Sequence, residues 1–90
     1  MPKYKKKPVI VDAEQWLGSK ESFDKILGMG LNKWKPGDMG ANNFTIETLE
    51  GDMLVILDDW VIKEPFPTDN RKFYPCKPDI FEATYELITS

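Results

Sequence analysis

The first regular pattern in the chain is an alternation of hydrophobic and polar residues. Val9, Val11 and Ala13 fall on one side of this alternation, and the acidic Asp12 falls on the other. A repeat of two residues is typical of a half-buried β-strand. We therefore predict a first strand over residues 8–16.

A helical repeat follows directly. Ile26 and Leu27 follow Phe23 by three and four residues, which places all three on one face of a helix. Ser19 suits the N-cap position, because its hydroxyl accepts a hydrogen bond from a free backbone N–H of the first turn. Gly28 suits the end of the helix. The sequence therefore predicts one helix between Ser19 and Gly28.

The central part of the chain predicts a loop and then a hairpin. Residues 29–43 are rich in glycine and asparagine and show no sustained repeat, so we expect a loop, with Trp34 as its anchor to the core. Residues 44–48 return to a two-residue alternation, and residues 53–57 form an apolar run. A turn at residues 50–52 joins the two segments as a β-hairpin.

Three further segments of the sheet are predicted after the hairpin. Residues 60–63 form a short apolar strand, and residues 72–74 resume the sheet. Between them, residues 64–70 contain two prolines that cannot donate ladder hydrogen bonds, so we expect an excursion on the surface. Residues 85–88 alternate again and predict a last strand.

A short helix and the order of elements complete the predicted fold. Pro78 suits the first turn of a helix in which Ile80, Phe81 and Thr84 share one face. The order of elements indicates a single α+β domain over residues 1–90, with a mainly antiparallel, bent sheet, an N-terminal helix and a short C-terminal helix. The largest expected contributors to its core are Trp16, Phe23, Phe44, Trp60, Phe73 and Phe81.

The composition excludes several classes of catalytic and metal-binding site. The chain has no histidine and one cysteine. It therefore lacks Ser-His-Asp and Cys-His catalytic sets, zinc sites built from Cys and His, and an internal disulfide. The acidic pair Asp58-Asp59 is typical of turns, because Asp side chains bond to their own backbone. We expect no catalytic activity, no cofactor and no metal site.

Charge is distributed unevenly along the chain. Residues 1–7 hold four of the twelve basic residues and none of the fifteen acidic ones, so residues 8–90 carry eight positive and fifteen negative charges, a formal charge of −7. An acidic body is not expected to bind duplex nucleic acid. We interpret the basic N-terminal flank as solubilising the first strand.

Neither a membrane span nor an export signal is expected from the sequence. The longest aliphatic run, residues 53–57, is far shorter than the roughly twenty residues that cross a bilayer. Asp12 and Glu14 interrupt the apolar stretch after the N-terminal lysines before it reaches the length of a signal peptide. We therefore expect a cytoplasmic protein.

The one cysteine, Cys76, lies between two prolines in residues 74–79 and beside Lys77. A neighbouring cation and a helix N-terminus both lower a thiol pKa, so a reactive cysteine is one hypothesis. A small buried residue is the plainer alternative. A third hypothesis is an anion site, in which Lys77 and the backbone N–H groups after Pro78 bind a phosphate or a carboxylate.

Aromatic residues indicate a further kind of site. Trp34, Trp60, Phe66 and Tyr74 are candidates for a platform that binds a ring-shaped ligand or a partner protein. Aromatic residues in small domains more often form the core, and we expect Phe66 and Trp34 to be exposed because they lie in predicted loops. The candidate binding residues are Trp60, Phe66, Tyr74, Cys76, Lys77 and Asp79.

Four segments of the chain form a distinctive set of motifs. The segments are residues 5–16, 51–53, 59–63 and 73–86. The last of them reads FYPCKPDIFEATYE, and together they are similar to a widespread group of small proteins encoded by tailed phages and prophages. The chain departs from the usual pattern at Asp58, where a glycine is typical, and over residues 64–71, where the turn is usually shorter. The resemblance implies a phage setting and carries no catalytic residue over.

Residues and resemblance together favour a non-catalytic accessory binding protein of phage type, in the cytoplasm of a bacterial host. Such a protein would inhibit a host factor or sequester a small anionic ligand, such as a nucleotide signal. The alternative is a structural or assembly component of a phage particle. The expected partner is a host or phage protein or the small anionic ligand, and the sequence leaves open whether the chain forms a homo-oligomer.

Overall fold

The fold is seen in a computed structural model of the chain, which describes residues 2–3, 10–37, 42–48, 50–63 and 73–86. In chain order, the elements within these residues are β1 (Asp12–Gln15), α1 (Lys20–Gly28), β2 (Trp34–Pro36), β3 (Phe44–Thr48), β4 (Gly51–Val55), β5 (Trp60–Lys63), β6 (Phe73–Cys76) and α2 (Pro78–Thr84). The predicted α+β class is confirmed. Neither of the helices described here is long and apolar enough to cross a membrane.

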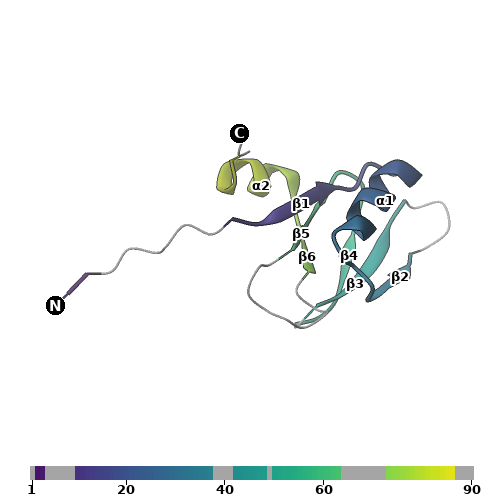
Figure 1. The fold of residues 1–90 in the computed structure, drawn as a ribbon, viewed down its shortest axis with the longest axis horizontal. Coiled ribbons are helices and arrows are strands. Elements are labelled where there is room, and N and C mark those ends of the chain that lie inside the picture. Colours follow the sequence, from purple (N-terminus) through teal and green to yellow (C-terminus); the bar gives the residue numbers. More distant parts are fainter. Residues whose placement is uncertain (1, 4–9, 38–41, 49, 64–72, 87–90) are drawn as a thin grey trace.

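The strands form two three-stranded sheets in which every pairing is antiparallel. The first sheet has the order β1-β5-β6, and the second has the order β2-β3-β4. Figure 1 shows the second sheet beside the first, with the chain passing from β4 into β5 to join them. The antiparallel sheet that the sequence predicts is thus divided into two layers.

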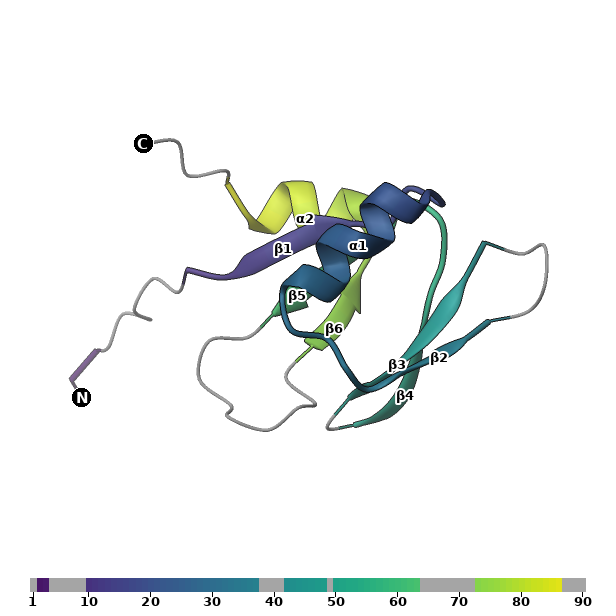
Figure 2. The ribbon, with the colours of Figure 1, turned by 45° about the vertical axis from the view of Figure 1, so that its right-hand side comes forward.

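Both faces of the first sheet are covered. Side chains alternate along β5, so that Val61 faces the main core while Trp60 and Ile62 face the opposite side. Ile26 of α1 belongs to the same buried cluster as Val61, whereas Phe81 of α2 stacks on Trp60. The two helices therefore cover opposite faces of this sheet, as the turned view in Figure 2 shows.

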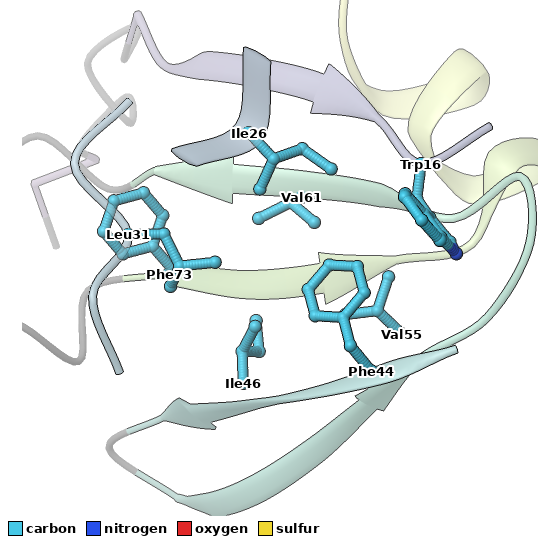
Figure 3. Close-up of a cluster of buried hydrophobic side chains, with 8 residues drawn as sticks. All are labelled: Trp16, Ile26, Leu31, Phe44, Ile46, Val55, Val61 and Phe73. Atoms are coloured by element: carbon cyan, nitrogen blue, oxygen red, sulfur yellow. The ribbon is translucent and has the colours of Figure 1, made fainter. Parts of the chain in front are cut away.

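The main core lies between the two sheets and α1. Figure 3 shows side chains of both sheets pointing toward one another, with Trp16 at one end of the cluster. The buried hydrophobic residues of this core are Trp16, Ile26, Leu31, Phe44, Ile46, Val55, Val61 and Phe73. Three of the six aromatic residues expected in the core are in this set, and Phe23 packs against it. The other two, Trp60 and Phe81, lie on the far face of the first sheet.

Helix α1 forms where predicted because its N-terminus is capped. Ser19 has an extended backbone (φ −103°, ψ 156°), and its hydroxyl accepts a hydrogen bond from Ser22 N at 3.1 Å. Ser22 Oγ accepts one from Ser19 N at 3.3 Å, so this capping box satisfies two backbone donors. The helix ends at Gly28 as predicted, but the left-handed residue after it is Gly30 (φ +103°).

The prediction of a loop over residues 29–43 is wrong at residues 34–36, which form β2 and pair with β3. Three residues are too few for a repeat to be visible in the sequence. Pro36 is tolerated because β2 lies at the edge of its sheet. Trp34 does anchor the segment, since its ring makes an edge-to-face contact with Phe23 at a centroid distance of 4.7 Å.

The predicted hairpin is confirmed, with its second strand shifted. Every second residue of β3, from Phe44 to Thr48, is buried, as the alternation predicts. β4 begins at Gly51, inside the predicted turn, and ends at Val55 rather than at residue 57. Thr48 Oγ1 donates a hydrogen bond to Gly51 O at 2.6 Å, which closes the turn between the strands.

The other predicted strands differ from the observed ones mainly in length. β1 covers four of the residues 8–16, and β6 continues through Pro75, which an edge strand tolerates. Tyr85 and Glu86 do not continue the sheet, contrary to the prediction of a last strand. The predictions for residues 4–9, 64–72 and 87–88 fall outside the described residues.

Helix α2 begins at Pro78 as predicted, but the face that packs is different. Phe81 stacks on Trp60, whereas Ile80 and Thr84 are exposed. No residue of α2 is buried. Ring contacts, rather than an apolar stripe of the predicted kind, therefore attach this helix to the first sheet.

Candidate functional site

The turn between β4 and β5 places a carboxylate inside the protein. The Asp59 side chain is 2% exposed, and Ile56 N donates a hydrogen bond to its Oδ2 at 3.1 Å. Lys77 Nζ donates to both carboxylate oxygens, at 3.2 Å for Oδ1 and 3.1 Å for Oδ2. These contacts tie the β4–β5 turn to the junction of β6 and α2.

Lys77, the cation of the predicted anion site, is also the partner of Asp59 in this ion pair. The Lys77 side chain is half-exposed, but its ammonium group is already paired with the buried Asp59 carboxylate. An incoming phosphate would have to compete with that carboxylate, which would then lie buried without a counter-charge. Asp79, exposed in the first turn of α2, adds a negative charge close by. The geometry therefore favours a structural role for Lys77.

The Cys76 thiol is arranged differently from a reactive cysteine. Its Sγ donates a weak hydrogen bond to Lys77 O at 3.7 Å. Partial burial raises the pKa of the Cys76 thiol, and the negative charges of Asp59 and Asp79 raise it further. The positive charge of the neighbouring Lys77 does not reverse this upward shift of the Cys76 pKa. This direction is opposite to the lowered pKa of a reactive cysteine, so it disfavours the reactive-cysteine hypothesis.

Four aromatic rings gather on the face of the first sheet that α2 covers. Trp60 and Phe81 stack at a centroid distance of 4.1 Å and an interplanar angle of 9°, and Tyr85 stacks on Phe81 at 5.0 Å. The hydroxyl groups of Tyr74 and Tyr85 lie 3.2 Å apart. This aromatic cluster fastens α2 to the sheet.

The indole N–H of Trp60 differs from that of Trp16. Trp60 Nε1 is buried and has no hydrogen-bond partner among the described residues. Trp16 Nε1, in contrast, donates to Asn42 O at 2.6 Å. Trp60 is therefore held by its ring contacts, and its buried donor is an energetic cost rather than a support.

The structure brings the candidate binding residues only partly together. Trp60 lies directly opposite Cys76 in the register of β5 and β6, and Tyr74 shares the same face of the sheet because it is two residues from Cys76. Lys77 faces Asp59 at the end of this face. Asp79 is exposed on α2, and Phe66 lies outside the described residues.

A second feature, which the sequence analysis does not predict, is a run of exposed apolar residues in β4 and in the turn that follows it. Met53, Leu54, Ile56 and Leu57 are exposed, while Val55 between them is buried. We name these four exposed residues the β4 apolar surface. A signal for it was present in the sequence: neighbouring residues of a strand point to opposite faces, so an uninterrupted apolar run exposes one face unless both are covered.

The β4 apolar surface continues toward the end of β1. A Cβ atom placed on Gly18 would lie 3.0 Å from Leu57 Cδ1, so Leu57 lies close to the Gly18 backbone. The neighbouring Leu17 is exposed as well. Asp58 N donates to Trp16 O at 2.8 Å, which holds the two segments together.

No group of three or more His, Cys, Asp or Glu residues within the described part of the chain is arranged to hold a metal ion. Comparisons with protein-family models, with curated proteins and with solved structures find no match to this chain. The assignment of a site therefore depends on the two surfaces described above: the α2-covered aromatic cluster and the β4 apolar surface.

Proposed function

We propose that this chain is a non-catalytic accessory binding protein of phage type that acts on a host protein through the β4 apolar surface. The observation that carries the proposal is the succession of exposed apolar side chains at Met53, Leu54, Ile56 and Leu57. Single exposed hydrophobic residues are ordinary, whereas here four of five consecutive residues are apolar and exposed, and gathered apolar exposure is typical of protein interaction sites.

A protein partner is favoured over a small anionic ligand. The one cation that the anion hypothesis requires, Lys77, is paired with the buried Asp59. The pKa of the Cys76 thiol beside it is raised by burial and by nearby carboxylates, which does not favour an anion-binding thiolate chemistry there. Apolar contact area is instead available on β4, and burial of such area drives most protein association.

The proposal is tested by capturing partners from bacterial lysate with two matched variants. Leu54→Lys places a charge in the β4 apolar surface, and Ile80→Lys places the same charge at a similarly exposed apolar residue of α2; the two residues are 52% and 55% exposed. We expect the unchanged chain and Ile80→Lys to retain a stoichiometric partner that Leu54→Lys loses. Equal retention by both variants, or recovery of the bait alone, contradicts the proposal.

An assembly role in a phage particle is the second candidate, because an unpaired strand edge such as that of β4 also serves to join subunits. A particle component is present at a defined copy number. Mass spectrometry of purified particles distinguishes this role from action on a host protein, since an accessory protein is not incorporated at a fixed ratio.

A further inference from the structure

The outer edge of β4 offers a short set of unpaired backbone groups. β4 is the last strand in the order β2-β3-β4, and no other strand of the described chain pairs with it. On β3, Glu47 N donates to Lys33 O at 2.9 Å, toward β2, so Asp52, opposite Glu47, directs its N–H and C=O groups away from β3. These directions alternate along a strand, so the same holds for Leu54.

The residues at either end of this set already use their backbone groups within the chain. Ile56 N donates to Asp59 Oδ2 at 3.1 Å, and Ile56 O accepts from Asp59 N at 3.0 Å. At the other end, Glu50 N donates to Thr48 Oγ1 at 3.1 Å. Among the described residues, the free edge of β4 is therefore confined to the two residues on either side of Met53.

A two-fold axis through Met53 maps this free edge onto itself. In antiparallel pairing about that axis, Asp52 of each copy lies opposite Leu54 of the other, and each pair exchanges both of its N–H···O bonds. Pairing centred on Asp52 would instead set two carboxylates opposite one another, which destabilises a sheet. Pairing centred on Leu54 would need the backbone groups that Ile56 already uses. The edge therefore fits a second copy in one register.

The side chains of the edge suit the same register. Lys35 Nζ lies 3.1 Å from Asp52 Oδ2 in the same copy, so this carboxylate has a cationic partner before any pairing. Across the dimer it lies opposite a leucine and not opposite another acid. Met53 and Leu54 are exposed and add apolar contact area beside the backbone bonds.

We infer that β4 pairs with β4 of a second copy of this chain about Met53, which joins the two three-stranded sheets into one sheet of six strands. Val55 is buried toward the core, so the neighbouring Leu54 lies on the outer face, and the two-fold axis places Leu54 of both copies on the same face of the joined sheet. The pairing goes beyond the proposed function. One consequence rests on that function: the surface that contacts the host protein contains residues of both copies.

Disulfide cross-linking of two variants in a Cys76→Ser background tests the register. Met53→Cys places the new thiols directly opposite one another, with about 4.5 Å between Cα atoms, which a disulfide spans. Leu54→Cys places them on a diagonal, roughly 7–8 Å apart, which a disulfide does not span. We expect Met53→Cys to form a covalent dimer in air about tenfold faster than Leu54→Cys, or more. Equal rates, faster cross-linking of Leu54→Cys, or no covalent dimer overturns the inference.

Hydrogen exchange in the unchanged chain tests the backbone contact without a substitution. The amides of Asp52 and Leu54 are free in a single copy and bonded in the dimer, so their exchange should slow as protein concentration rises. The amide of Ile56 is the internal control, because its bond to Asp59 does not depend on pairing. Exchange at Asp52 and Leu54 that does not change with concentration, or sedimentation as a single copy throughout, contradicts the dimer.

Two variants of Asp52 isolate one hydrogen bond while keeping the apolar side chains. Asp52→Pro removes an outward N–H, which an edge strand tolerates, and Asp52→Ala keeps it; both variants lose the ion pair with Lys35. The two-fold symmetry removes the bond twice. We therefore expect Asp52→Pro to raise the dimer dissociation constant about tenfold or more relative to Asp52→Ala in sedimentation. Equal constants contradict the pairing, and the cross-linking test still applies if Asp52→Pro does not fold.

The outcomes separate this inference from the proposed function. If Met53→Cys forms no covalent dimer while a host protein is retained by the unchanged chain and lost on Leu54→Lys, the proposed function stands and the pairing is wrong. If the covalent dimer forms but Leu54→Lys retains the host protein, the pairing stands and the proposed function fails. Equal retention of the host protein by dimeric Asp52→Ala and monomeric Asp52→Pro contradicts the joint surface.

Discussion

The ion pair between Asp59 and Lys77 predicts an unequal response to losing either partner. Lys77→Met removes the counter-charge of the Asp59 carboxylate, which is 2% exposed in the unchanged chain and also accepts a hydrogen bond from Ile56 N. Breaking a buried ion pair from one side typically costs 3–5 kcal/mol, and the 53% exposure of the Lys77 side chain allows water to approach. We therefore expect Lys77→Met to lower the free energy of unfolding by about 2 to 4 kcal/mol.

Asp59→Asn removes the same ion pair at a smaller cost. The amide oxygen still accepts the Ile56 N–H, and the ammonium of Lys77, already half in solvent, turns to water. The expected loss is about 1 kcal/mol. The double variant Asp59→Asn with Lys77→Met contains no buried charge at this position, so its stability should be close to that of Asp59→Asn alone rather than to the sum of the two losses.

Urea unfolding of the four proteins, followed by circular dichroism, gives the midpoint and slope needed for this comparison. Lys35→Met is the control, because the Lys35–Asp52 pair is exposed and its loss should cost less than about 1 kcal/mol. A loss for Lys77→Met no larger than that for Asp59→Asn, or losses that simply add in the double variant, would contradict the buried ion pair as the source of this stability.

Three other predictions follow from local geometry. Ser19→Ala breaks the capping box of α1 and should cost about 1 kcal/mol in urea unfolding; an unchanged midpoint contradicts the role of the cap. Trp60→Phe removes a buried hydrogen-bond donor that has no partner, and it should change the free energy of unfolding by less than about 1 kcal/mol. Trp16→Phe loses the hydrogen bond to Asn42 O and should lower the free energy of unfolding by about 2 kcal/mol or more. Calorimetry shows which of the two variants is the less stable. Because the pKa of Cys76 is raised in the folded chain, iodoacetamide should react with it only at higher pH than in the urea-unfolded chain, and the stability linked to the neutral thiol should be lost as pH rises through the folded pKa. Identical pH profiles contradict this assignment.

Elements that depend on neighbouring residues could be predicted from the sequence. Ser19 caps α1 through a residue only three positions away, and Phe23, Ile26 and Leu27 face the core because of their spacing. β3 likewise shows its burial directly in its alternation. In these segments, local preference and tertiary packing favour the same structure, so a short stretch of sequence is enough to predict the element.

Features that depend on distant residues could not be predicted in the same way. Residues 34–36 form β2 because they pair with β3, and no pattern within these three residues indicates a strand. Asp59 has the sequence context of a turn residue, and the turn is present, but its buried charge is explained only by Lys77, 18 positions later. The sequence near Lys77 indicates an available cation, and the fold uses that cation to neutralise Asp59. The cation of the candidate site predicted around Cys76 is therefore engaged by a contact that no local pattern contains.

The two sheets differ in which of their residues remain exposed for contact with other molecules. The first sheet is covered by α1 on one face and by the aromatic cluster and α2 on the other, so its candidate residues are largely occupied by internal contacts. The second sheet presents β4, which is an edge strand among the described residues and carries exposed apolar side chains at Met53 and Leu54. An apolar strand edge is an aggregation hazard, which proteins commonly limit with charge. Here Asp52, which is exposed on β4 two residues before Leu54, places such a charge on the strand.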